Sequence, residues 1–178
     1  MTREQRAREI KRYIEQNSEL IINMVDEIVG EYVGELDDFI EKVKNILERV
    51  RQGQQDYTND FLEMQMIKLP VIMYYSINGL EDLGAESDIA KAHKQQKYNE
   101  VYVRVTGTIP EREAESNMQV LNEAMMEAVY SRAYKKLKSK VDMADKLLSA
   151  IKKAMNKRIK EMDIELQREG LGRFDEEQ

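Results

Sequence analysis

A run of apolar residues with heptad spacing occupies the first third of the chain. The intervals between its members alternate between three and four residues: Ile22, Val25, Val29, Tyr32, Leu36, Phe39, Val43, Ile46 and Val50. This spacing places every member on one side of an α-helix, and that side needs a partner helix to cover it. We therefore predict that this segment forms a coiled-coil helix. We expect these residues to mediate oligomerisation, although coiled-coil packing alone also explains the pattern.

Few residues in the chain interrupt helical structure. The 178 residues include only 2 Pro and 8 Gly, no Trp and no Cys, whereas 35% are charged. This composition favours helix and leaves few turns for a β-sheet. We therefore predict an all-α protein, an elongated helical bundle or coiled coil with long N- and C-terminal helices that forms an oligomer.

Pro and Gly residues, together with runs of apolar residues, predict where helices begin and end in the middle of the chain. A second helix is expected from about Asn59, with a kink or a restart at Pro70. The run from 71 to 80 is the most apolar in the chain and predicts burial among several helices. Residues 85–105 favour helix over a short strand at their end, and the Thr-Gly-Thr sequence at 106–108 predicts a break.

The last third of the chain has a clear helix start. Pro110 suits the first turn of a new helix, and residues 110–169 then form one helix or two, with the change from acidic to basic sequence near Ser131 as the expected break. We expect three segments: a heptad helix over 1–54, a helical core with a basic C-terminal helix over 55–169, and an acidic tail over 170–178.

Positive charge is concentrated in one segment of an acidic chain. The formal net charge of the protein is −6, yet residues 132–160 contain eleven Lys and Arg against two acids. At about 100° per residue of helix, nine of the eleven fall within an arc of roughly 160°, opposite an apolar face. One face is therefore expected to pack against other helices and the other to meet an anion.

A positive helix face neutralises phosphates and releases counterions, which gives salt-dependent, sequence-blind binding of nucleic acid. Tyr134 adds a stacking surface, and a thinner patch from Lys94 to Arg104 mixes basic and aromatic residues, as suits unpaired bases. We predict single-stranded nucleic acid as the ligand, contacted by Lys94, Lys97, Tyr98, Tyr102, Arg104, Arg132, Tyr134, Lys135, Lys136, Lys140, Lys146, Lys153, Lys157, Arg158 and Lys160.

Other interpretations of the basic segment stay open. Its lysines can pair with the acidic N-terminal helix, within one chain or between subunits. A basic amphipathic helix can also lie on an anionic membrane, but the apolar side of this one has no Trp or Phe anchors. The competing function is a non-enzymatic coiled-coil scaffold or protein inhibitor of phage or mobile-element origin.

Motifs for catalysis and cofactor binding are missing from the sequence. It contains no GxxxxGK[ST] or GxGxxG phosphate loop, no HExxH and no Cys nucleophile, and His93 is the only histidine. The acidic clusters are interpreted as solvated charge. We expect no enzyme activity, cofactor or metal. The charged N-terminus and the lack of a long apolar run predict a cytoplasmic protein without membrane association, in the host cytoplasm if it is phage-encoded.

The order of elements between Phe61 and Met162 carries a resemblance. An apolar, Tyr-rich run (Met73-Tyr74-Tyr75-Ser76) precedes a Lys-rich helix that ends near Gly107. An acidic connector then leads to a terminal helix with Tyr134-Lys-Lys-Leu and, further on, Leu148-Ser-Ala-Ile-Lys-Lys-Ala-Met-Asn-Lys-Arg. In this order and residue character the stretch resembles the UvsY-type recombination mediator proteins of phages.

The resemblance implies a role and partners. Mediators of that family are small helical proteins that form ring-like oligomers, bind single-stranded DNA and help to load a RecA-like recombinase in place of a single-strand-binding protein. The family's Lys-x-Arg element before the Gly corresponds here to Lys94, Lys97 and Arg104, with Glu100 between them. The resemblance therefore implies a homo-oligomeric, single-stranded-DNA-binding recombination mediator. The heptad helix has no counterpart in that family.

Overall fold

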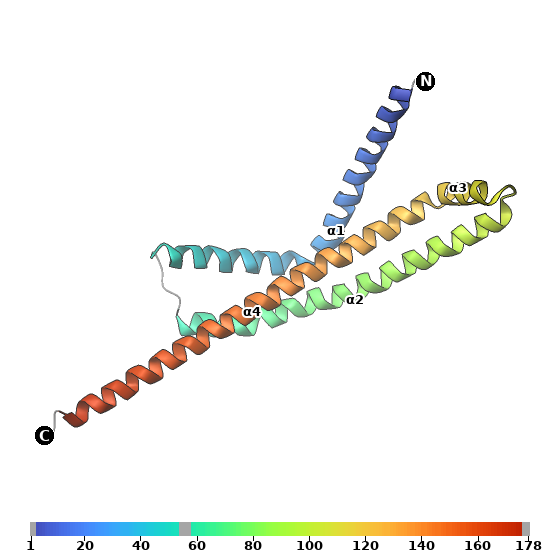
Figure 1. The fold of residues 1–178 in the computed structure, drawn as a ribbon. Coiled ribbons are helices and arrows are strands. Elements are labelled where there is room, and N and C mark those ends of the chain that lie inside the picture. The colour runs from blue at the N-terminus through green and yellow to red at the C-terminus, as the bar shows by residue number, and fades with distance from the viewer. Residues whose placement is uncertain (1–2, 54–57, 176–178) are drawn as a thin grey trace. The chain divides into compact units, whose positions relative to one another are not determined.

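Helices account for almost all of the described chain (Figure 1). The structure is a computed structural model that describes the backbone of residues 3–53 and 58–175, and the side chains of 17–49, 52–53 and 58–166. These residues contain no β-strand, so the prediction of an all-α protein is confirmed. The helices are α1 (Arg3–Arg51), α2 (Asn59–Arg104), α3 (Ile109–Gln119) and α4 (Leu121–Asp175).

Local signals place several helix boundaries correctly. α2 begins at Asn59 and ends at Arg104, just before the expected break at 106–108, but it does not restart at Pro70, which lies inside the helix. Thr108 is the N-cap of α3, and its backbone N–H and its hydroxyl both donate to the Glu111 carboxylate at 2.8 Å. These two hydrogen bonds, the backbone one foremost, lower the pKa of Glu111. The start of α3 is therefore stabilised by a capping box.

The C-terminal helical region is interrupted earlier than the sequence predicts. The irregular residue is Val120 (φ −105°, ψ 16°), whereas Ser131 lies inside α4. The Val120 N–H still donates to the Ser116 carbonyl at 3.2 Å, and the Val120 carbonyl accepts from the Ala124 N–H at 2.9 Å. A change of charge near Ser131 does not break the helix, because helical hydrogen bonds join backbone groups. α4 continues to Asp175 and thus includes most of the predicted acidic tail.

The chain divides into two compact units, and α1, α2 and α4 contribute residues to both. The first unit contains Met1–Val33 and Ser76–Ser139, and the second contains Gly34–Tyr75 and Lys140–Gln178. The segments predicted along the chain, 1–54, 55–169 and 170–178, stay a prediction.

Three helices share an apolar core in the second unit. Leu36 of α1, Leu69 of α2 and Ala144 of α4 are each 0% exposed. Full burial of an aliphatic side chain contributes about 1.5–3 kcal/mol relative to leaving it in water. Burial of this core is therefore the main contribution to the stability of the second unit. Its members are Leu36, Phe39, Val43, Leu62, Leu69, Met73, Ala144, Leu148 and Ile151.

In the first unit, α1 and α2 approach closely at a glycine. A Cβ atom placed on Gly79 would lie 2.1 Å from Cδ1 of Tyr32. One turn earlier in α2, the Ser76 hydroxyl donates to the Tyr32 carbonyl oxygen at 2.8 Å. Desolvation by this packing is the main cause that raises the pKa of Tyr32. Gly79 thus permits a helix contact that a larger residue would prevent.

The heptad seam of α1 finds its partner helices within the chain. Val25 and Val29 are buried in the first unit, and Leu36, Phe39 and Val43 in the second. Further seam residues are half-buried (Tyr32, Ile46) or exposed (Ile22), and the side chain of Val50 lies outside the described residues. The buried members are occupied by contacts within one chain, so an oligomer would have to use other surfaces.

The most apolar run of α2 is only partly buried, which corrects the expectation from sequence. Met73 and Ser76 face inward, but Val71, Tyr74 and Tyr75 are 59%, 62% and 65% exposed. An uninterrupted apolar run longer than one turn presents residues on every side of a helix. Its outward members need their own cover, which the described part of the chain does not provide.

Candidate nucleic-acid interface

The basic segment of α4 carries its charges on the side away from the buried residues. In the first unit the buried positions of this segment are Ala133 and Leu137, and in the second they include Leu148 and Ile151. Nine of the eleven Lys and Arg residues between 132 and 160 are exposed. The amphipathic division expected from the sequence is therefore present along the segment.

Two lysines of this segment pair with acids of α1. In the first unit Lys136 contacts Asp26, and in the second the Lys140 ammonium donates to both carboxylate oxygens of Asp37 at 2.6 and 2.5 Å. Such partly exposed pairs contribute at most about 1 kcal/mol each. Both lysines flank the apolar face of α4, so they bind the neighbouring helix within the chain.

Arg158 is a further member of the predicted site that contacts a neighbouring helix. Its Nη1 donates to Oδ1 of Asn59 at 3.5 Å, and the Asn59 amide group contacts the sulfur of Met162 at 3.3 Å. Arg158 therefore lies against the first turn of α2, and it is only half exposed.

The remaining basic residues point outward. Within the part of the chain that the structure describes, seven of the eleven have neither a hydrogen bond nor an ion pair, and Lys157 has only a 3.5 Å pair with the exposed Glu161. The seven are Arg132, Lys135, Lys138, Lys146, Lys152, Lys153 and Lys160.

Four outward lysines of the second unit form a row, which we call the lysine stripe. Its members are Lys146, Lys153, Lys157 and Lys160, all exposed. Their intervals of seven, four and three residues place them within roughly 60° of one another around the helix, over about 21 Å of its length. The stripe is a row of positive charges that is exposed in the described part of the chain.

The thinner patch between Lys94 and Arg104 is neutralised by α4. In the first unit Lys94 pairs with Glu127 at 2.8 Å, and Lys97 pairs with Glu123. The hydrogen bond from Lys97 is the main cause that lowers the pKa of Glu123. Neither acid was identified from the sequence. Their four-residue spacing places both on one face of α4, and that is the signal from which they could have been identified.

The aromatic residues of this patch contact other protein groups. The rings of Tyr98 and Tyr102 are stacked, with centroids 6.0 Å apart and planes 17° apart. The guanidinium of Arg112, which the sequence did not single out, lies 4.1 Å from the centroid of the Tyr102 ring and donates to the Tyr102 carbonyl oxygen at 2.5 and 3.0 Å. Arg104 is exposed and has no partner in the described chain.

The side chain of Tyr134 also packs against a neighbouring helix of the first unit. It is half-buried, and its ring carbons lie 3.5 and 3.8 Å from where a Cβ atom of Gly84 would be. The ring therefore rests near α2 within the first unit. Its packing leaves less of the ring open to a base than the sequence implied.

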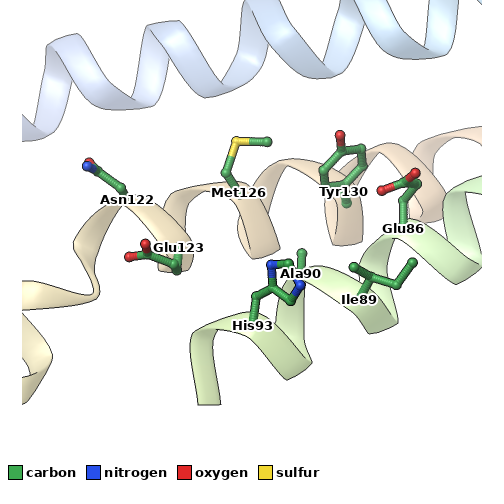
Figure 2. Close-up of a pocket in the computed structure, with 8 residues that line it drawn as sticks. All are labelled: Glu86, Ile89, Ala90, His93, Asn122, Glu123, Met126 and Tyr130. Atoms are coloured by element: carbon green, nitrogen blue, oxygen red, sulfur yellow. The ribbon is translucent and has the colours of Figure 1, made fainter. Parts of the chain in front are cut away.

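A hollow of about 290 Å³ lies between α2 and α4 in the first unit (Figure 2). Figure 2 shows Ile89, Ala90 and His93 on one helix and Met126 and Tyr130 on the other. This volume is at the small end of ligand pockets.

The hollow presents few groups capable of chemistry. Glu123 directs one oxygen to Lys97 and leaves the other, Oε2, buried without a hydrogen-bond partner. His93 has no hydrogen bond or ion pair in the described chain. Among the described residues no group of three His, Asp or Glu side chains is placed to hold a metal ion. The hollow therefore shows an apolar lining and no nucleophile held by a base.

Comparison of the chain with protein-family models, with curated proteins and with solved structures gives no match. A search of the described helices for membrane spans finds none that is both long and apolar enough.

Proposed function

We propose that this protein binds single-stranded DNA through the outward face of α4 and acts as a recombination mediator that helps to load a RecA-like recombinase. The observation that carries the proposal is the lysine stripe, four exposed lysines in one row. Cations with no strong protein partner exchange their counterions for phosphates at little structural cost. The lysines that pair with α1 and the patch around Lys97 are not needed for this binding.

The salt dependence of binding follows from the number of lysines in the stripe. For single strands, the logarithm of the binding constant falls with the logarithm of salt concentration by about 0.7 per neutralised phosphate. If all four lysines contact phosphates, the stripe alone contributes a slope of about −3. Other outward basic residues, such as Lys135 and Lys138, would steepen it.

Fluorescence anisotropy with a labelled oligonucleotide tests the proposal. The test variant replaces Lys146, Lys153, Lys157 and Lys160 with Gln. A control variant with the same change of net charge replaces four exposed basic residues elsewhere with Gln, namely Lys42, Lys44, Arg49 and Lys91. The stripe variant should bind more weakly and with a shallower salt slope, whereas the control should lose much less.

Three results would refute the proposal. They are no binding of single strands at low salt, equal losses in the stripe and control variants, and tighter binding of duplex than of single strand. The preference for single strands was predicted from the patch between Lys94 and Arg104 and from the family resemblance. The mediator role rests on the resemblance alone, so it needs its own assay. The protein should accelerate the single-strand-dependent ATPase of a RecA-like recombinase on DNA pre-coated with single-strand-binding protein.

A second candidate function is a helical scaffold whose charges serve only packing. The ion pairs Lys136–Asp26, Lys140–Asp37 and Lys94–Glu127 favour it, because they place basic residues of the predicted site against acids of the same chain. Its net charge of −6 also opposes polyanion binding. The anisotropy titration separates the two functions, since a scaffold predicts no binding that depends on the stripe.

A further inference from the structure

α2 carries a second apolar row in the second unit, on the side opposite the core. We call it the apolar stripe, and it consists of Met64, Ile67, Val71 and Tyr74, which are 49%, 66%, 59% and 62% exposed. Tyr75 flanks the stripe and is 65% exposed. Within the described residues no other helix covers these side chains.

The spacing of the apolar stripe is that of a coiled-coil seam. Its intervals are three, four and three residues, so its members occupy alternating a and d positions of a heptad. The inward row of the same helix, with Leu62, Leu69 and Met73, is already filled by the core of the unit. A contiguous apolar surface of this kind on a helix marks an interaction site.

The charges beside the apolar stripe indicate which partner fits. With Met64 and Val71 at a positions, Glu63 takes a g position and Lys68 the e position of the next heptad. Both are exposed, and neither has a hydrogen bond or ion pair in the described chain. In a parallel pair of identical helices, g of one copy meets the following e of the other, so Glu63 would meet Lys68 twice. In an antiparallel pair g positions face g positions and e positions face e positions, so no Glu63–Lys68 pair would form.

We propose that the apolar stripe of α2 is the docking surface for a second copy of this chain, in parallel orientation and in register. The two stripes would form a short coiled coil bordered by two Glu63–Lys68 ion pairs. This inference does not depend on the proposed function, because one copy carries a complete lysine stripe. If both hold, pairing repeats the DNA-binding surface and raises avidity.

The size of the surface determines how strong the pairing can be. A standard stable interface buries about 800 Å² on each partner, and four stripe residues with one flanking Tyr cover less than that. The dimer is therefore expected to form reversibly, with a monomer–dimer equilibrium that depends on protein concentration.

Sedimentation equilibrium over a wide range of protein concentrations tests the surface. The full chain should shift from monomer to dimer, and Val71→Glu should weaken dimerisation by about tenfold or more, since burying an unpaired charge is costly. Val103→Glu is the matched control, because Val103 lies on the same helix, is 79% exposed and is outside the stripe. A wild-type monomer at every concentration, or equal dimerisation by both variants, would overturn the proposal. Circular dichroism at 222 nm checks that each variant is folded.

Cross-linking tests the orientation. The chain has no Cys, so Met64→Cys introduces a single thiol at one end of the stripe. In the parallel pair the two thiols are adjacent and a disulfide-linked dimer should form on mild oxidation. In an antiparallel pair centred on the stripe they would be about 15 Å apart, ten residues of helix. Absence of the cross-link in a protein that dimerises would refute the parallel arrangement.

A charge exchange provides a second test of orientation. Glu63→Lys alone should weaken the dimer, because two lysines then face each other, and Glu63→Lys with Lys68→Glu should restore it. A double variant that stays as weak as the single one would contradict the proposed pairing.

Discussion

Gly79→Ala should destabilise this protein, although the same substitution elsewhere in its helices should stabilise it. The new methyl group would lie 2.1, 2.5 and 2.8 Å from Cδ1, Cγ and Cε1 of Tyr32. Cγ is the ring atom nearest the backbone, so the whole ring has to move, and with it the contact between α1 and α2. The Ser76 hydrogen bond to the Tyr32 carbonyl resists a shift of the backbone.

Two opposing contributions set the magnitude. Replacing a helical Gly with Ala gains up to about 1 kcal/mol of helix propensity. Forcing an extra methyl group into a tight contact costs about 1–3 kcal/mol, and the distances to Tyr32 put this site at the upper end. The net loss at Gly79 is therefore about 1–2 kcal/mol. For a chain of this size that lowers the melting temperature by about 2–8 °C.

Gly34→Ala is the matched control. Gly34 is an exposed position of α1, and a Cβ atom there meets nothing within 4 Å. The substitution should raise the free energy of unfolding by about 0.5–1 kcal/mol. Thermal and urea unfolding, followed by circular dichroism at 222 nm, measure both variants. A stabilised Gly79→Ala protein would show that the close approach to Tyr32 does not exist.

A double-mutant cycle isolates the contact. Removing the ring with Tyr32→Ala costs stability by itself, but it also removes the atoms that the new methyl group would meet. On that background Gly79→Ala should become stabilising, as at Gly34. If the cost of Gly79→Ala persisted without the ring, the cause would lie elsewhere and the contact argument would fail.

Three further predictions concern the core and two carboxylates. Leu36→Ala should lower the free energy of unfolding by about 2–5 kcal/mol in urea titration, because the side chain is 0% exposed; a loss below about 1 kcal/mol would mean that it is not packed. The contribution of Glu111 to the start of α3 is fully present above the unfolded pKa of 4.5 and is lost as the pH falls through the lowered folded pKa. Protection of the α3 amides from hydrogen exchange, relative to an unfolded chain at the same pH, should fall as Glu111 is protonated. Glu111→Gln should remove this pH dependence of the protection. Lys97→Met should raise the pKa of Glu123 toward its ordinary value in a carboxyl NMR titration, and an unchanged pKa would contradict the ion pair.

The sequence anticipated features that depend on neighbouring residues. The start of α2 at Asn59, the break at 106–108 and the start of α3 before Pro110 depend on a few adjacent residues, and the structure has them as expected. The interruption at Val120 was not foreseen, because no Pro or Gly marks it.

The candidate site was anticipated less completely than the helices. The sequence located the positive face of α4 and offered pairing of its lysines with the acidic N-terminal helix as an alternative, which the Lys136–Asp26 and Lys140–Asp37 pairs confirm, but it did not identify the individual acids. Asp26 and Asp37 lie 110 and 103 residues from Lys136 and Lys140, and Glu123 lies 26 residues from Lys97. Helical periodicity places a side chain on a face of its own helix, and it carries no information about what a distant helix brings to that face.

By itself, then, the sequence determined that the chain is helical, where α2 begins and ends, where α3 begins, and which faces of the heptad segment and of the basic segment are apolar or charged. Backbone hydrogen bonding and side-chain periodicity are local, so they can be inferred from neighbouring residues. Only the tertiary structure decided that the buried residues of the α1 seam are covered by the chain's own helices, that the Tyr32 ring packs against Gly79, and that the apolar stripe of α2 stays exposed. Those outcomes depend on which helix faces pack against one another. Close packing in three dimensions decides this, and the periodicity of a single helix does not.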